Sequence, residues 1–423
     1  MKIQHFMALV VLSLATVPGA RAAAATNTWT GADPSGYWSA PANWSPAGVP
    51  VNGNDLVFPG GLPPGDKVST NDLTDRVFRS IRFQAGGHTI RGNPITLTNS
   101  PDCIVNSGTN VIACDVTFSG TPSTSTYGAW SIRGYPPLGE LTVIGNVGGG
   151  SLYVFNERLV IRGQFTGGSL RQEYGSLALY GDNPHAVSVE IYGSSYSTLR
   201  VQGSQPNLNI TMLWEMESAS CPSLSGDGVV GDVTGCGHIT PDSTLSVKNL
   251  GHYGGWGGLD IRLNGTNVGE YGRLVASGDV SLSSGSLLPS AGFNPQAGQI
   301  YTIVEKTSPG PITNAIFGPE GSITTLNGMP FRISYVGGDG NDVTLTVVTP
   351  VPIVLGAVQR FGTQFVFSYS ADVGLRYAVE RSATLTNWTT IRTNTANVNP
   401  MTFTDTAATN RMNFYRVRRL ANP

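Results

Sequence analysis

A short apolar alternation closed by glycine returns four times between Leu141 and Gly203. The copies start at Leu141, Leu159, Leu177 and Leu199, so their first residues lie 18, 18 and 22 positions apart. Each copy has the length of one short strand and a turn, and such a strand cannot bury its apolar face alone. The repeat therefore predicts a solenoid in which successive turns of the chain stack and share one core.

Composition favours many short strands over long helices or disorder. Only 12% of the 423 residues are charged, against about 25% in an average soluble protein. The chain holds 54 glycines and 27 prolines, and 40% of its residues are hydrophobic. It is thus rich in turns and still has enough apolar side chains for a large core. A net charge of −2 and the lack of a basic stripe with aromatics make nucleic acid an unexpected partner.

Residues 1–24 have the organisation of a secretory signal peptide. Lys2 supplies the positive start, Phe6 to Val17 the apolar core, and Ala20-Arg21-Ala22 a small-x-small cleavage site. The apolar core is shorter than the roughly 20 residues that a transmembrane helix needs. We therefore expect a mature chain without a transmembrane segment, soluble or surface-bound outside the inner membrane. Periplasm, outer surface and medium are all compatible with this pattern.

The four cysteines suit an oxidising compartment. Cys103 and Cys114 lie 11 positions apart, and Cys221 and Cys236 lie 15 apart. Three pairings exist in principle. The two local disulfides are expected, because loops between neighbouring turns bring nearby positions within bridging distance. A metal site is the alternative, but no C-x-x-C motif and no histidine at finger spacing accompany the cysteines.

Between Trp29 and Phe58, aromatic residues alternate with glycine, asparagine and proline. We expect short strands and tight turns whose rings pack as a lid. An open solenoid end needs such a cap, because an uncovered strand edge recruits other chains. The alternative is a surface on which carbohydrate rings stack.

The same segment resembles a known family. Its motifs are Trp29-Thr-Gly31, Gly36-Tyr-Trp38, Asn43-Trp44, Gly48-Val-Pro50 and Gly53-Asn-Asp55-Leu-Val57-Phe58, and related motifs return between Tyr271 and Leu345. This arrangement is similar to bacterial surface proteins that carry autotransporter-associated β-strand repeats. The resemblance implies a right-handed parallel β-helix, exported to the surface of a bacterium, over residues 25–348. It implies no catalytic residues.

The remaining chain predicts a second domain. Residues 349–352 read Thr-Pro-Val-Pro, a short semi-rigid linker, since proline holds the chain extended and cannot donate to a ladder. Residues 353–423 alternate strongly and predict six or seven strands at the spacing of a β-sandwich. The segments Tyr377–Ser382, Leu385–Trp388, Phe403–Asp405 and Phe414–Val417 resemble a C-terminal module of secreted bacterial proteins, similar in outline to fibronectin type III. The predicted fold class is all-β, a parallel β-helix with a small C-terminal β-sandwich.

One pair of carboxylates is a catalytic candidate. In Trp214-Glu215-Met-Glu217, strand alternation would set Glu215 and Glu217 on one face, about 6–7 Å apart. That separation suits the acid/base pair of a glycosidase, and Trp214 would stack on a sugar. A solvated strand face is the alternative.

One turn is a candidate metal site. Gly337–Asp342 matches the start of the calcium-binding β-roll repeat, with Asp339 and Asp342 as oxygen ligands. A β-roll site needs ligands from successive copies, and the sequence has only one. A hairpin turn is the favoured interpretation, and no other cofactor is indicated.

These observations favour a non-enzymatic exported scaffold or adhesin-like protein whose partner is a polysaccharide or a cell-surface component. The sequence contains no H-E-x-x-H motif, no G-x-S-x-G elbow and no phosphate loop. The alternatives are a carbohydrate-active enzyme, either a polysaccharide lyase or a glycoside hydrolase, and a carbohydrate-binding protein. The acidic residues whose convergence would favour the enzyme are Glu157, Glu173, Glu215 and Glu217. The tryptophans that would serve carbohydrate binding are Trp214, Trp256 and Trp388.

Overall fold

The computed structural model describes residues 25–98, 102–120, 129–213, 221–252, 258–281, 285–288, 293, 295–313, 318–326 and 329–420. Their regular structure is β-strand, apart from the short 3-10 helices η1 (Pro41–Asn43) and η2 (Pro64–Lys67). The predicted all-β class is confirmed. In the described part of the chain, no helix has the length and apolar character needed to cross a membrane. The predicted signal peptide lies outside the described residues.

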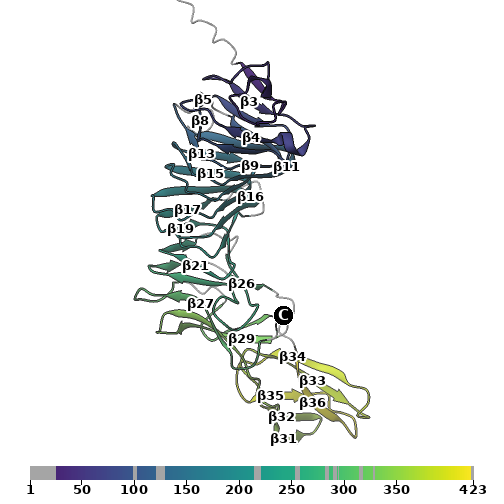
Figure 1. Ribbon diagram of the computed structural model, residues 1–423. Coiled ribbons are helices and arrows are strands. Elements are labelled where there is room, and N and C mark those ends of the chain that lie inside the picture. The colour runs from purple at the N-terminus through teal and green to yellow at the C-terminus, as the bar shows by residue number, and fades with distance from the viewer. Residues whose placement is uncertain are drawn as a thin grey trace, which may run out of the picture.

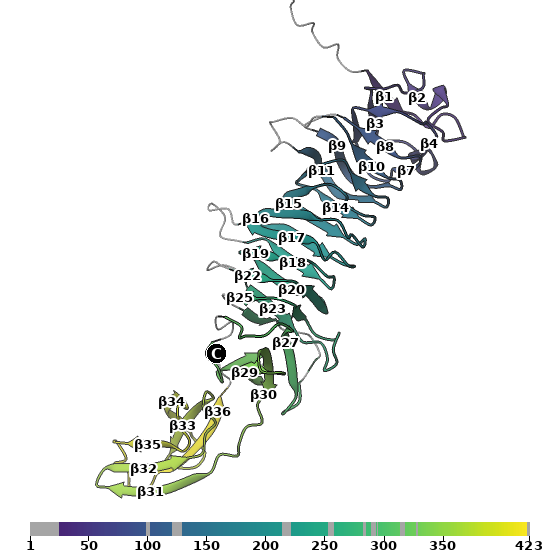
Figure 2. The same cartoon turned by 90° about the vertical axis from the view of Figure 1, so that its left-hand side faces the viewer.

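The strands form an elongated stack with the N-terminal segments at one end and the C-terminal module at the other (Figures 1 and 2). Among the described residues, twenty strands belong to one sheet. They are β1 (Thr26–Trp29), β2 (Trp44–Ser45), β3 (Asp55–Phe58), β4 (Val68–Asn71), β6 (Ser80–Phe83), β7 (Thr89–Gly92), β9 (Asp102–Ile112), β11 (Trp130–Val143), β13 (Leu152–Phe155), β14 (Arg158–Ile161), β15 (Ser169–Leu179), β16 (Val187–Val201), β17 (Leu208–Leu213), β18 (Ser223–Gly226), β19 (Val233–Gly235), β20 (His238–Pro241), β22 (Leu250–His252), β23 (Gly258–Arg262), β25 (Val280–Ser281) and β26 (Gly285–Leu288).

Two further sheets complete this part of the molecule. A four-stranded sheet contains β5 (Val77–Phe78), β8 (Ile95–Leu97), β10 (Val116–Phe118) and β12 (Val147–Gly148). A six-stranded sheet contains β21 (Thr244–Val247), β24 (Arg273–Ala276), β27 (Ile300–Lys306), β28 (Ile323–Leu326), β29 (Met329–Gly337) and β30 (Asp342–Val347). The pairing in the four-stranded sheet is parallel, whereas β27 to β30 pair antiparallel. The parallel stacking therefore ends in an antiparallel segment.

The four repeat segments pair in parallel and in register. Leu141 lies opposite Leu159, Leu159 opposite Leu177, and Leu177 opposite Leu199. All four side chains are at most 1% exposed. Because residues alternate between the two faces of a strand, this register sends every repeat leucine into the same core. A register shift after Glu173 takes up part of the longer spacing before Leu199.

Glycine closes each repeat because successive turns approach closely there. A Cβ placed on Gly163 would lie 2.4 Å from the carbonyl oxygen of Gly145, and one on Gly181 would lie 2.4 Å from the carbonyl oxygen of Gly163. Atoms that close overlap, so any side chain would push the turns apart. We call Gly145, Gly163 and Gly181 the glycine column.

One hydrophobic core extends from Trp29 to Val347. At its N-terminal end, Trp29, Trp38 and Trp44 are at most 2% exposed. The ring centroids of Trp29 and Trp44 are 5.1 Å apart and those of Trp38 and Trp44 are 5.7 Å apart, both edge to face. These rings pack inward as a cap requires, and they are not exposed as a platform for sugars.

The C-terminal module has its own core, which begins at Val348. Two three-stranded antiparallel sheets surround it. One contains β31 (Leu355–Phe361), β32 (Gln364–Tyr369) and β35 (Met401–Asp405), and the other β34 (Thr389–Thr395), β33 (Arg376–Ser382) and β36 (Phe414–Leu420). The boundary predicted at residues 349–352 stays a prediction, with a separate core on each side of it.

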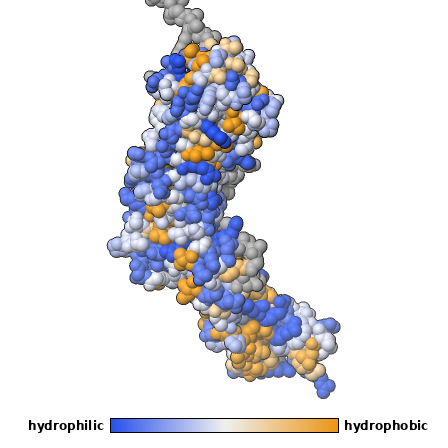
Figure 3. Space-filling view, viewed as in Figure 1, coloured by the Kyte–Doolittle hydropathy of each residue, from blue (hydrophilic) through white to orange (hydrophobic). Residues whose placement is uncertain are grey.

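The surface is mostly hydrophilic, with apolar residues gathered over the C-terminal module (Figure 3). There the edge strand β31 exposes Val358 by 61% and Phe361 by 62%. Exposed edges of this kind can pair with other chains.

Candidate functional site

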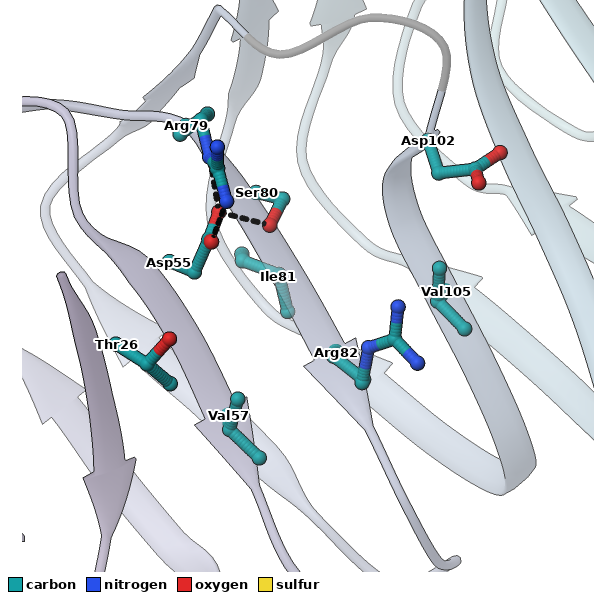
Figure 4. A pocket seen from close by; sticks show the side chains of 9 residues that line it. All are labelled: Thr26, Asp55, Val57, Arg79, Ser80, Ile81, Arg82, Asp102 and Val105. Atoms are coloured by element: carbon teal, nitrogen blue, oxygen red, sulfur yellow. Dashed lines mark hydrogen bonds and ion pairs between the residues drawn. The ribbon is translucent and has the colours of Figure 1, made fainter. Parts of the chain in front are cut away.

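An open groove lies on the outward face of β1, β3, β6 and β9 (Figure 4). Its volume is about 320 Å³, at the lower end of the range of about 300–1,000 Å³ typical of small-molecule sites. The residues that line it are Thr26, Asp55, Val57, Arg79, Ser80, Ile81, Arg82, Asp102 and Val105. Parallel pairing aligns Asp55 with Ser80 and Val57 with Arg82, so side chains from different turns meet on one surface.

On one side of the groove, a tight ion pair holds Asp55. The guanidinium of Arg79 donates from Nε to Asp55 Oδ1 at 2.7 Å and from its terminal nitrogen to Oδ2. Ser80 Oγ donates to Asp55 Oδ1 at 2.6 Å. The hydrogen bond to Asp55 raises the pKa of Arg79. This side of the groove carries opposite charges that compensate each other.

Arg82 stands apart from that pair. Its side chain extends towards Val105 of β9, and the register places it between Val57 and Val105 (Figure 4). Arg82 is exposed, and no described residue forms an ion pair or side-chain hydrogen bond with it. On the far side, Asp102 is paired with Arg133 at 2.6 Å. Within the described part of the chain, Arg82 is thus the cation at the groove that lacks a carboxylate partner.

Further along the same face, charged and aromatic side chains satisfy one another. Tyr153 Oη donates to Glu173 Oε2 at 2.7 Å. Arg171 pairs with Glu173 at 2.8 Å and with Glu190 at 3.2 Å, and its guanidinium lies 4.8 Å from the ring centroid of Tyr192. These contacts connect side chains from three turns. The guanidinium of Arg171 covers one face of the Tyr192 ring.

Glu157 has a different environment from Glu173. It is 2% exposed, and its Oε1 accepts from Asn106 Nδ2 at 3.3 Å and from the backbone N–H of Arg158 at 2.9 Å. Its Oε2 is buried and has no hydrogen-bond partner among the described residues. Burial raises the pKa of Glu157 to about 7 in spite of these bonds. Glu157 and Glu173 are thus held by different hydrogen-bond partners.

Several predicted site residues lie outside the described residues, namely Trp214, Glu215, Glu217 and Trp256. The catalytic and sugar-stacking roles predicted for them stay predictions. Trp388 is described: its Nε1 donates to the carbonyl of Leu385 at 2.9 Å, and the guanidinium of Arg416 lies 4.3 Å from its ring centroid. One face of this ring is therefore occupied by an arginine.

The predicted calcium turn connects two antiparallel strands. Gly337 at the end of β29 pairs with Asp342 at the start of β30, the geometry of a hairpin. Asp342 Oδ1 accepts from the backbone N–H of Lys306 at 2.9 Å, and burial raises the pKa of Asp342. Among the described residues, no three His, Cys, Asp or Glu side chains group as a metal site. Calcium binding by Asp339 and Asp342 stays a prediction.

The cysteines fall into two environments. Cys103 and Cys114 are buried in the main core, where burial raises the pKa of each thiol to about 12. Cys221 lies in hydrogen-bond contact with Cys236, and burial together with this neighbour raises the pKa of Cys221 to about 12. Both disulfides stay predictions, and the structure positions Cys221 and Cys236 close together.

A histidine–aspartate pair occurs on later turns of the stack. His238 Nδ1 is 2.7 Å from Asp260 Oδ2, and parallel pairing places Ser223 next to His238. A carboxylate bonded to one ring nitrogen fixes the orientation of an imidazole. In the described part of the chain no hydrogen bond joins Ser223 to the ring.

Sequence reasoning did not find the groove. Alternation alone sends Asp55, Val57 and Arg82 outward, and this was the available signal. What was missing is the register between turns, which decides that these side chains meet.

No protein-family model, curated protein or solved structure matches this chain.

Proposed function

We propose that the protein is an exported bacterial β-solenoid that acts as an extended scaffold carrying a C-terminal β-sandwich. The observation that carries the proposal is the parallel, in-register pairing of successive turns around a single core. Stacked turns protect the backbone by pairing it on both sides, and they set the two ends of the chain far apart. A right-handed coil is expected, since parallel crossover connections are right-handed in about 98% of cases.

The resemblance to proteins with autotransporter-associated β-strand repeats supports the same proposal. It agrees with the signal-like segment at residues 1–24 and with the low content of charged residues. The C-terminal module, which resembles fibronectin type III in outline, would serve attachment or spacing. In this proposal the molecule adheres to a polysaccharide or cell-surface component or acts as a spacer, and this role depends on its rigidity.

Localisation and shape test the proposal. Fractionation of cells that produce the full chain is expected to place the mature protein outside the inner membrane, and deletion of residues 1–24 should retain it in the cytoplasm. Small-angle scattering of the mature chain should give the distance distribution of an elongated particle. A cytoplasmic full-length protein or a globular scattering profile would contradict the proposal.

A matched pair of variants tests the stacking itself. Leu177 is fully buried, whereas its neighbour Ala178 points to the other side of the strand and is half-buried. Leu177→Asp would place a charge in the core and should abolish resistance to proteinase K. Ala178→Asp should leave that resistance largely intact. Equal sensitivity of both variants would argue against a stacked core at this position.

A further inference from the structure

We propose that the groove over β3, β6 and β9 binds an acidic sugar, a uronic acid residue of a polysaccharide, with the sugar carboxylate on Arg82. The proposed scaffold function does not require this site. The site would give the scaffold a specific ligand. The proposal rests on the charge, the shape and the lining of the groove.

Charge points to a single anionic group. Asp55 is compensated by Arg79 and Asp102 by Arg133, which leaves Arg82 as the uncompensated cation among the described residues. A planar guanidinium binds a carboxylate through two parallel hydrogen bonds, so one arginine suffices for one carboxylate. Phosphate sites typically add several backbone donors, as at a helix N-terminus, and this groove is built on strands.

The lining around Arg82 suits a sugar ring. Val57 lies beside Arg82 in the same row, is partly exposed, and offers apolar contact to the C–H face of a ring. Val105, on the other side of Arg82, is buried. Thr26 and Ser80 supply hydroxyl groups from the neighbouring row, and the Thr26 side chain is exposed. Together these groups contact a ring that carries one carboxylate and several hydroxyls (Figure 4).

The shape of the groove suits a polymer. Its volume of about 320 Å³ accommodates a small ligand, and it lies open on the face of the sheet. A residue within a longer chain can therefore enter it sideways, without an end having to thread into a cavity. The overall charge of −2 does not concentrate polyanions nearby, so binding would depend on the local contact with Arg82.

Calorimetric titration of the mature full chain with de-esterified oligogalacturonate tests the proposal. We expect saturable binding that weakens about 10- to 100-fold in Arg82→Gln, the loss typical of a hydrogen-bonded charge pair. Arg91→Gln is the matched control, because Arg91 is also exposed but belongs to β7 and does not line the groove. Arg91→Gln should bind like the wild type.

Three further ligands identify what the groove recognises. Methyl-esterified oligogalacturonate and a neutral oligosaccharide should bind at least about 10-fold more weakly than the acid. Inorganic phosphate should not compete. Equal loss in Arg82→Gln and Arg91→Gln, equal affinity for the methyl ester, or full competition by phosphate would each overturn the proposal. Thermal unfolding of both variants should match the wild type, so lost binding cannot be attributed to misfolding.

Discussion

The side-chain amide of Asn249 donates to the carboxylate of Asp232 at 2.7 Å, although the two residues lie 17 positions apart in the chain. Similar side-chain hydrogen bonds connect the neighbouring turns on both sides, and we call this series of bonds the asparagine ladder. Asn249 Oδ1 accepts from the backbone N–H of Asp279 at 2.8 Å, and Asn209 Oδ1 accepts from the backbone N–H of Asp232 at 2.9 Å. Side chains thus bond the turns that connect the strands, where the strand ladder itself provides no partner.

Replacement of Asn249 tests this ladder. Asn249→Ala removes one hydrogen bond as donor and one as acceptor, and should lower the free energy of unfolding by about 1–3 kcal/mol. Urea denaturation measures the change. Lys248→Ala is the control, since Lys248 is exposed next to it, and should change stability by less than about 0.5 kcal/mol. Equal effects of the two substitutions would show that the ladder contributes nothing.

The close approach of turns at the glycine column predicts that alanine at Gly163 destabilises the fold. Gly163→Ala would bring a methyl group within 2.4 Å of the carbonyl oxygen of Gly145, so the turns must separate. We expect a loss of about 1–3 kcal/mol, the usual range for overpacking. Gly168→Ala is the matched control, because nothing lies within 4 Å of a Cβ at that position. Thermal and urea unfolding of both variants would measure the difference, and a stable Gly163→Ala protein would contradict the close approach.

The raised pKa of Glu157 predicts how this residue makes stability depend on pH. Its pKa is raised from 4.5 to about 7 by burial, which outweighs its hydrogen bonds, and the charge of Glu140 adds to the rise. Between these pH values the folded state keeps a proton on Glu157 that the unfolded state has released. The contribution of Glu157 to stability is therefore greatest below about pH 4.5 and falls as the pH rises towards 7. The loss from this one group is on the order of 3 kcal/mol.

The variant Glu157→Gln isolates that contribution. Glutamine keeps an oxygen for Asn106 and Arg158 but does not ionise, so the difference in stability between wild type and variant should shift in favour of the variant from pH 4.5 to 7. Glu140→Gln, which removes only the neighbouring charge, should retain most of the wild-type slope. Urea unfolding at a series of pH values provides the curves. Parallel curves for wild type and Glu157→Gln would show that Glu157 ionises normally in the folded state.

The all-β class and the parallel pairing of the repeat segments could be predicted from the sequence because one turn repeats the requirements of the previous one. Leu141, Leu159 and Leu177 recur at a constant spacing since each must enter the same core, and glycine follows where turns touch. The groove could not be predicted from the sequence. Asp55 and Arg82 are separated by a whole turn, and a register shift between Ser131 and Ile132 disturbs the alignment beside it. Local patterns carry no information on such offsets.

The positions of the four cysteines predict which pair forms a disulfide on oxidation. Cys103 lies in β9 and Cys114 just beyond its end, and the two parts of β9 pair with different strands, β6 and β7. A disulfide needs Cα atoms within about 7 Å, and Cys221 lies in hydrogen-bond contact with Cys236. The geometry therefore favours a bridge between Cys221 and Cys236 over one between Cys103 and Cys114.

A bridge closing the loop between Cys221 and Cys236 should stabilise the oxidised protein by about 3 kcal/mol. Reductant should therefore lower the urea midpoint of the wild type. In Cys236→Ser the midpoint should no longer respond to reductant, whereas Cys114→Ser should lose core stability and still respond, because it leaves the bridge in place. Thiol labelling of the unfolded, unreduced chain should modify Cys103 and Cys114 and spare the other two. Labelling of Cys221 and Cys236 in protein purified from the cell exterior would show that their contact remains a hydrogen bond between thiols.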